Sequence, residues 1–180
     1  MDLVSIIIPY YKKKKYISTT INSAISQSYK NIEIIIVYDD ENYDDLKLLE
    51  EIKKKDERIR IIKNKKKMGA GLSRNIGISS STGNYIAFLD ADDTWEADKL
   101  SRQMSFMTDN NYLASHTSYQ IVDEYRNIIG NRVARSFLNL EDLLKSCDIG
   151  TSTVIIKKNI LDDQIKFPSI KTKEDFVLWL

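Results

Sequence analysis

The feature that most constrains the fold of this chain is an apolar run that ends abruptly in acidic residues. Residues 85–89 (YIAFL) lead directly into Asp90, Asp92 and Asp93. Such a run is typical of a buried strand, whereas three neighbouring carboxylates repel one another and resist burial. A bound cation or a chemical step must account for acids at the end of this strand.

Apolar runs of the same kind alternate with segments of helical spacing through the first half of the chain. Strands are expected at residues 3–11, 31–40, 58–64 and 84–89, and helices at residues 16–28, 43–55 and 72–80. The strand runs are continuously apolar, which is typical of parallel strands with helices packed on both faces. The sequence therefore predicts an α/β fold with a Rossmann-like, mostly parallel central sheet.

The second half is less regular and predicts a small antiparallel element. The expected elements are a helix at residues 95–110, an antiparallel hairpin around residues 126–131, a helix at residues 139–147 capped by Asn139, a strand at residues 151–158 and a helix from residue 172 capped by Thr172. No repeat or Pro/Gly-rich linker divides the chain, so residues 1–180 are predicted to form a single domain.

The composition excludes several classes of protein. The 27 basic and 26 acidic residues give a net charge of +1, so no large basic field points to nucleic acid. Cys147 is the only cysteine, which excludes an internal disulfide and fits a reducing compartment. Its apolar neighbours predict that Cys147 is a small buried side chain.

Neither a signal peptide nor a membrane-spanning run is visible in the sequence. We therefore expect a cytoplasmic protein, with peripheral contact at the inner face of the membrane left open. The lysine run at residues 12–15 indicates a solvated loop, and the alternative is a surface that helps a membrane or an anionic substrate approach. The sequence does not indicate the oligomeric state.

The acids fall where ligands bind in a parallel sheet, which is outside the carboxyl ends of the strands. Asp39 and Asp40 follow the second predicted strand, and residues 90–93 follow the fourth. Adjacent carboxylates suit a hard divalent cation, Mg²⁺ or Mn²⁺, which would relieve their repulsion and recruit a phosphate. The alternative is a solvated acidic loop, or a helix N-cap at Asp93 or Thr94.

Four separated segments resemble the motifs of one family, in the same order. They are residues 4–11 (VSIIIPYY), 32–40 (IEIIIVYDD), 68–93 (MGAGLSRNIGISSSTGNYIAFLDADD) and 173–180 (KEDFVLWL). With these motifs the chain resembles bacterial family 2 glycosyltransferases, which are inverting enzymes with a GT-A fold that use nucleotide-sugars. The resemblance covers essentially the whole chain, and residues 68–93 are its most specific part.

The resemblance implies a donor site in the first half of the chain. By position, Asp39 would accept a hydrogen bond from the nucleotide base, with uracil the commonest base in relatives. Pro9 and Tyr11 would line the same pocket, although each also fits a simple strand end. Arg74 and Asn75 would lie near the donor diphosphate or sugar, and the alternative for Arg74 is a surface position on an amphipathic helix.

The resemblance also implies a metal at the 90–93 segment. Asp90 would contact the ribose or the ion, and Asp92 would coordinate Mn²⁺ or Mg²⁺ between the two phosphates of a donor that is most commonly a UDP-sugar. Asp93 would position the sugar, and Ala91 lies between these ligands. The ion would act as a Lewis acid on the leaving diphosphate.

The late motif carries the implied general base. Asp175 would take the proton from an acceptor hydroxyl, and Glu174 precedes it in the same acidic pair. The alternative is that both acids only favour the first turn of a helix. Residues 1–93 would then form the nucleotide-binding half, and residues 94–180 the acceptor and catalytic-base half. Relatives continue beyond this motif, so we expect a C-terminally truncated fragment with a poorly formed acceptor half.

The expected acceptor is a cell-surface glycan or a lipid-linked sugar. Two other classes stay open. One is a non-catalytic module that binds nucleotide-sugars. The other is a haloacid-dehalogenase-like phosphatase, because residues 90–94 (DADDT) also match its D-x-D-x-T motif. That motif normally follows a first strand rather than a fourth, and Lys157 with Asp162 and Asp163 are poor substitutes for its remaining residues.

Overall fold

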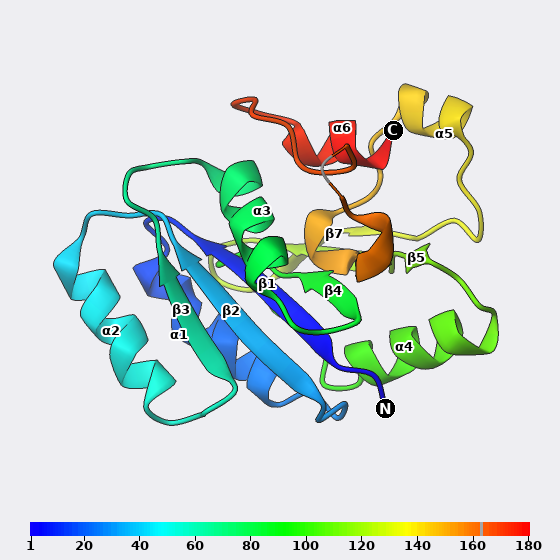
Figure 1. The fold of residues 1–180 in the computed structure, drawn as a ribbon. Coiled ribbons are helices and arrows are strands. Elements are labelled where there is room, and N and C mark those ends of the chain that lie inside the picture. The colour runs from blue at the N-terminus through cyan, green and yellow to red at the C-terminus, as the bar shows by residue number, and fades with distance from the viewer. Residues whose placement is uncertain (163) are drawn as a thin grey trace.

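The computed structural model describes residues 1–162 and 164–180 of the chain, so Asp163, considered above for a phosphatase site, lies outside the described residues. Four parallel strands form most of one six-stranded sheet (Figure 1). They are β1 (Val4–Tyr10), β2 (Ile32–Tyr38), β3 (Ile59–Lys63) and β4 (Tyr85–Phe88). This confirms the predicted mixed α/β fold with a mostly parallel sheet.

The sheet order is β3-β2-β1-β4-β8-β5. β8 (Ile155–Lys157) is antiparallel to β4, and the short β5 (Ala114–Ser115) is antiparallel to β8. The chain therefore builds outward from β1 to β3 and then crosses to the other side of β1 to form β4. The order of the strands reverses between β1 and β4.

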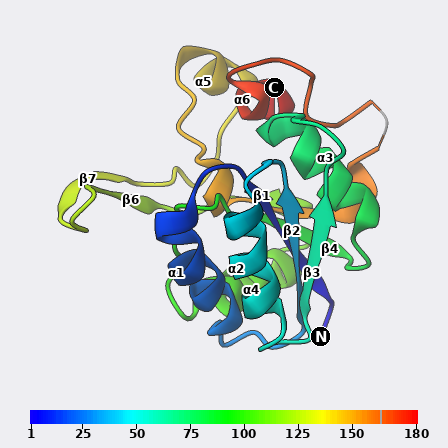
Figure 2. The same ribbon diagram turned by 90° about the vertical axis from the view of Figure 1, so that its left-hand side faces the viewer.

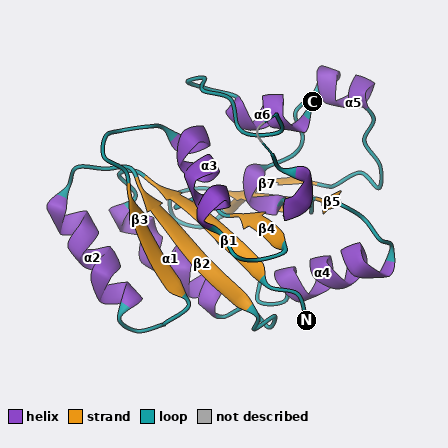
Figure 3. Ribbon diagram, in the orientation of Figure 1, coloured by secondary structure: helices purple, strands orange, loops and turns teal. Residues whose placement is uncertain are grey.

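Helices cover both faces of the sheet (Figure 3). α1 (Lys14–Ile25), α2 (Tyr43–Lys53) and α4 (Lys99–Asp109) pack on one face, and α3 (Ala70–Ser80) and α6 (Glu174–Trp179) pack on the other. Within β1, Ile6 and Ile8 join the first core cluster while Ile7 joins the second. Both sides of the strand are buried, which explains why its apolar run is continuous.

The antiparallel hairpin forms a separate two-stranded sheet from β6 (Tyr119–Val122) and β7 (Ile128–Arg132), and Figure 2 shows it extending away from the rest of the chain. Its turn lies at residues 123–127, so most of the 126–131 segment is a strand rather than the turn. Asp123 fixes this position, because its carboxylate accepts hydrogen bonds from the backbone N–H groups of Tyr125 and Asn127 at 2.9 and 2.8 Å.

Two helices of the second half begin elsewhere than expected. The helix expected at residues 95–110 is α4, which begins at Lys99 after Asp98, and this rules out the alternative of an N-cap at Asp93 or Thr94. α6 begins at Glu174, and Lys173 before it has a left-handed backbone (φ 62°) without a side-chain cap, so Thr172 is not the cap. By contrast, Asn139 caps α5 (Leu140–Lys145) in a capping box, as predicted.

Two further expectations need correction. The predicted strand at residues 151–158 opens with a 3₁₀ turn, η1 (Thr151–Thr153), and only β8 pairs in the sheet before a second turn, η2 (Lys158–Ile160). The Thr153 hydroxyl donates to the Gly150 carbonyl at 2.6 Å and so competes with extended pairing. Cys147 is exposed rather than buried, because it lies beyond the last turn of α5.

A buried carboxylate forms a hydrogen-bonded network at the amino ends of the strands, opposite the acids. Glu33 on β2 is 8% exposed. Its Oε1 accepts hydrogen bonds from the Ser5 hydroxyl at 2.7 Å and the Thr82 N–H at 2.6 Å, and its Oε2 accepts one from Arg60 at 3.0 Å. Burial alone would raise the pKa of Glu33, but these hydrogen bonds lower it below its usual value.

We expect Glu33→Gln to lower the free energy of unfolding by about 1–3 kcal/mol, because a charged acceptor is lost from a buried network. The folded pKa is depressed, so the stabilisation is present above the unfolded pKa and disappears as pH falls through the folded pKa. Urea unfolding between about pH 7 and pH 3 should therefore show the gap between wild type and variant closing in acid. Exposed Glu57→Gln is the matched control, and an equal effect there would contradict the role of Glu33.

Candidate active site

The candidate site lies where β1 and β4 separate at their carboxyl ends. Ile7 is the last β1 residue paired with β4, and its carbonyl accepts from the Leu89 N–H at 3.0 Å. Pro9, two residues on, faces the same side and has no N–H to continue this ladder. Because strand order reverses here, this is the crevice where ligands of open α/β sheets bind.

Asp39 directly follows β2 at this end of the sheet. The residue is 4% exposed. Its Oδ1 accepts from the Asn64 amide and the Met68 N–H, and its Oδ2 accepts from the Gly69 N–H, each at 2.7 Å. Asn42, rather than Asp39, caps α2. Asp39 therefore holds the loop between β3 and α3 against the end of β2.

Arg74 lies at the centre of the site and is 4% exposed. One terminal nitrogen donates to Asp90 Oδ1 at 2.7 Å and the other donates to Glu174 Oε1 at 2.8 Å. Burial alone would lower the pKa of Arg74, but the two carboxylates raise it above its usual value. Arg74 is therefore not the surface residue of an amphipathic helix; it joins the end of β4 to α6.

Gly71 on α3 makes room for this pair. A Cβ at position 71 would lie 2.8 Å from Glu174 Cγ and 3.3 Å from Phe167 Cβ. Such contacts are too short to accept without movement, so a larger residue would displace Glu174 from Arg74. The glycine in the most specific family-like segment thus has a packing reason in this fold.

The three acids of the 90–93 segment each have a different partner. Asp90 pairs with Arg74, Asp92 Oδ2 accepts from Lys13 Nζ at 2.6 Å, and Asp93 Oδ2 accepts from the Ser152 hydroxyl at 2.5 Å. Loss of hydration, followed by the charges of Asp90 and Asp92, raises the pKa of Asp93, although solvent still reaches its side chain. Within the described part of the chain, no three Asp, Glu, His or Cys side chains converge as a preformed metal site.

Asp175 faces the same region from α6. Its Oδ2 accepts from the Thr151 hydroxyl at 2.8 Å, and its Oδ1 accepts from the Phe176 N–H at 2.8 Å. Glu174, by contrast, forms an ion pair with Arg74. The two acids of the predicted pair therefore have separate surroundings.

The remaining predicted site residues are placed as follows. Asn75 pins the backbone of Phe167, donating to its carbonyl at 2.8 Å and accepting from its N–H at 3.0 Å. The Ala91 carbonyl accepts from the Thr20 hydroxyl at 3.0 Å. Tyr11 is 36% exposed, and Lys67 Nζ lies 3.8 Å from the centre of its ring. These residues line or support the crevice through contacts that their sequence positions alone did not reveal.

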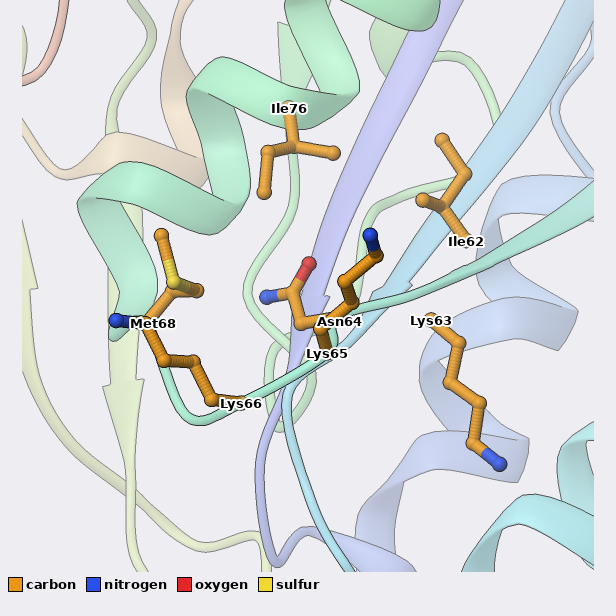
Figure 4. A pocket seen from close by; sticks show the side chains of 7 residues that line it. All are labelled: Ile62, Lys63, Asn64, Lys65, Lys66, Met68 and Ile76. Atoms are coloured by element: carbon orange, nitrogen blue, oxygen red, sulfur yellow. The ribbon is translucent and has the colours of Figure 1, made fainter.

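A surface hollow of about 490 Å³ lies beside the Asp39 loop (Figure 4). It is lined by Ile62, Lys63, Asn64, Lys65, Lys66, Met68 and Ile76. Asn64 and Met68 connect it to Asp39, but none of the predicted site acids lines it. The hollow is therefore a neighbour of the site rather than its centre.

Three site contacts were not predicted from the sequence. Lys13 pairs with Asp92, and Thr151 and Ser152 donate to Asp175 and Asp93. The lysine run gave no signal as to which member would reach an acid. The sequence predicts a strand through residues 151–153, although three consecutive hydroxyl residues there are a signal for a turn.

Comparison with known families agrees with this geometry. A family model described as Glycosyl transferase family 2 matches residues 5–164, which includes the acids that follow β2 and β4. The chain belongs to glycosyl transferase family 2. Membership of this glycosyltransferase family confirms the resemblance seen in the motifs and leaves the phosphatase alternative without support.

Curated relatives can be aligned to this family 2 chain along its whole length. It is 42% identical over 180 residues to the Escherichia coli protein named UDP-Glc:alpha-D-GlcNAc-diphosphoundecaprenol beta-1,3-glucosyltransferase WfaP, covering 100% of this chain and 70% of WfaP. The chain covers 26% of a Rickettsia bellii glycosyltransferase, 29% of a Rickettsia felis one and 71% of a Bacillus subtilis one.

Solved structures confirm the GT-A fold of this family 2 chain. Residues 1–349 of Staphylococcus aureus TarS, solved in complex with UDP, superpose with a TM-score of 0.78 at 23% identity, and the match covers 99% of this chain and 54% of that fragment. The mannosyltransferase PcManGT from Pyrobaculum calidifontis, solved with GDP-Man and Mn²⁺, gives a TM-score of 0.69 at 15% identity, covering 96% and 49%.

We expect Arg74→Met to lower the free energy of unfolding by about 2–3 kcal/mol, because Asp90 and Glu174 lose their shared partner. The loss should fall below that of a fully buried pair because Asp90 keeps 34% of its side chain exposed. Arg102→Met, which removes an exposed ion pair with Asp98, is the control and should change stability by less than about 0.5 kcal/mol. Equal urea midpoints for the two variants would contradict a central role for Arg74.

Proposed function

We propose that this protein transfers a sugar from a UDP-sugar to a hydroxyl of a lipid-linked sugar diphosphate, inverting the anomeric configuration. One observation carries the proposal: Arg74 joins Asp90 to Glu174, which brings together two acids, one after β4 and one on α6, that are 84 positions apart in the sequence. The name of WfaP suggests UDP-glucose as the first donor to test and a diphosphoundecaprenol-linked sugar as the acceptor class.

Asp175 is the general base of the proposed reaction. Its carboxylate takes the proton of the acceptor hydroxyl as that oxygen attacks the anomeric carbon. The bond from this carbon to the diphosphate breaks, and UDP leaves with the bonding electrons. A base in this position contributes about 10²–10⁴-fold to the rate. The proposal is supported by the side-chain position of Asp175, which Thr151 fixes at 2.8 Å.

Arg74 and Asp39 support the donor in this proposal. Arg74 Nε has no hydrogen-bond partner within the described part of the chain, which leaves one donor of the guanidinium unused. The Asp39 N–H donates to the Tyr10 carbonyl at 2.9 Å, which places Asp39 at the end of the first two strands, where the base of the nucleotide would lie. Residues 1–93 would hold the donor, and residues 94–180 would supply the base and the acceptor side.

The acids of the 90–93 segment fit Mn²⁺ or Mg²⁺ by their chemistry, because these ions prefer carboxylate oxygens. Asp92 and Asp90 would hold the ion, which supplies Lewis-acid stabilisation of the leaving diphosphate when bound. Asp92 forms an ion pair with Lys13 in this structure, but the two side chains remain 39% and 42% exposed. Such an exposed pair is worth about 0–1 kcal/mol, so a divalent cation can replace it.

A lipid-linked acceptor would bring the reaction to a membrane surface. No described helix is long and apolar enough to span a membrane. Three lysines of the 12–15 run already pair with Asp92, Asp45 and Glu124. We therefore attribute membrane contact at the inner, cytoplasmic face to the acceptor itself rather than to this lysine run.

We expect Asp175→Asn to abolish sugar transfer while leaving donor binding within about two-fold, because the variant keeps the shape of the side chain and loses the base. Transfer is followed as UDP release from UDP-glucose with a GlcNAc-diphosphate carrying a short lipid, and binding by calorimetry with UDP. Exposed Asp109→Asn on α4 is the control. Full transfer by Asp175→Asn would remove the base assignment, and no transfer by wild type would favour a non-catalytic binding module.

We expect UDP to raise the thermal midpoint more with Mn²⁺ than with EDTA, because a ligand that binds only the folded state stabilises it. At 100 times the dissociation constant the gain is about 2.7 kcal/mol. Asp92→Asn should lose the Mn²⁺-dependent part and keep the rest. Identical shifts with Mn²⁺ and EDTA in wild type would count against a metal at the 90–93 segment.

A further inference from the structure

Two adjacent hydroxyl residues touch the two halves of the site. Thr151 donates to Asp175 on α6, and Ser152, the next residue, donates to Asp93 after β4. The Ser152 hydroxyl also accepts from the Asp90 N–H at 3.0 Å. Since consecutive Cα atoms are only about 3.8 Å apart, this turn sets how the proposed base lies relative to the 90–93 acids.

The turn itself is held firmly in place. Thr151 and Thr153 are 6% and 5% exposed. The Thr153 N–H and hydroxyl both donate to the Gly150 carbonyl, at 2.9 and 2.6 Å. From outside the turn, the Ser152 carbonyl accepts from the Trp95 indole at 2.7 Å and the Thr153 carbonyl accepts from the Gln103 amide at 3.0 Å. η1 is thus tied to the protein body independently of α6.

α6 needs such an external support. It has only six residues, and the Lys173 that precedes it provides no side-chain cap. A helix this short is not stable without tertiary contacts. Its Trp179 packs near Phe88 and Phe167, with ring centres 6.4 and 6.3 Å apart. These apolar contacts hold the helix, but they do not fix the torsion of the Asp175 side chain.

We propose that the turn η1 positions the site, with Thr151 orienting the carboxylate of Asp175 and Ser152 orienting Asp93 and the backbone at Asp90. With Thr151 Oγ1 on one oxygen and the Phe176 N–H on the other, both carboxylate oxygens of Asp175 are fixed. This inference rests on the proposed role of Asp175 as general base. Thr151 acts through Asp175 and is a positioning residue, not a group that touches substrate.

The test compares Thr151→Val, which keeps the shape and removes the donor, with Thr151→Ser, which keeps the donor. In the full-length protein, with UDP-glucose, Mn²⁺ and a GlcNAc-diphosphate carrying a short lipid, Thr151→Val should lower kcat about 10-fold, which is the loss of one hydrogen bond to a charged group. KM for UDP-glucose should stay within about two-fold. Thr151→Ser should restore kcat to within about three-fold of wild type.

Thr153→Val is the matched control from the same turn, because its hydroxyl donates to the Gly150 carbonyl and not to an acid. We expect a lower thermal midpoint for this variant with an unchanged kcat below that midpoint. Ser152→Ala should instead raise the dissociation constant for UDP with Mn²⁺, because Asp93 and the Asp90 backbone lose their partner.

The outcomes separate this inference from the proposed function. If Asp175→Asn is inactive but Thr151→Val has the kcat of wild type, the turn does not position the base, and the inference fails alone. If Thr151→Val and Thr153→Val lose kcat equally, the turn is only structural and the inference is also overturned. If Asp175→Asn keeps full activity, the proposed base fails first.

Discussion

The arrangement of the site depends on the ion pairs that the buried guanidinium of Arg74 forms with two carboxylates. A charge taken out of water is costly unless it is paired and hydrogen-bonded. Arg74 meets this requirement with one carboxylate from the end of β4 and one from α6. Because both partners are needed, burial of Arg74 requires α6 to lie over the crevice. Gly71 makes this approach feasible by leaving room for Glu174.

The place of the site follows from the topology of the sheet. The strand order reverses between β1 and β4, and Pro9 ends the pairing between them without leaving an unpaired N–H. At the amino ends of the strands, Glu33 accepts hydrogen bonds from the N–H groups of Thr82 and Gly83, which connect α3 to β4. This hydrogen-bonded carboxylate therefore holds the chain together at the amino ends, and the proposed ligand site lies at the carboxyl ends.

The acids at this site differ in the number and kind of their hydrogen-bond and ion-pair partners. Asp39 and Glu174 are committed to loop and ion-pair contacts, whereas Asp92 and Asp175 each keep a single side-chain partner, Lys13 and Thr151. An exposed ion pair is readily exchanged for another ligand, and a single hydroxyl donor leaves the carboxylate with lone pairs for further hydrogen bonds. These surroundings support the roles proposed for Asp92 as a metal ligand and for Asp175 as the general base.

The sequence by itself determined the strands and helices of the first half, because their apolar periodicity and their acidic ends are local properties of the chain. It also determined the family, through motifs carried by residues 4–93 and 173–180. The tertiary structure alone decided the partners of those acids and the irregular second half. Thr151, Ser152 and Lys13 reach the acids only because β8, η1 and α1 fold back to the crevice. Such long-range contacts leave no periodic signal in a single sequence. The strand predicted through residues 151–153 is a turn, because the bond from the Thr153 hydroxyl to the Gly150 carbonyl outweighs extended pairing there.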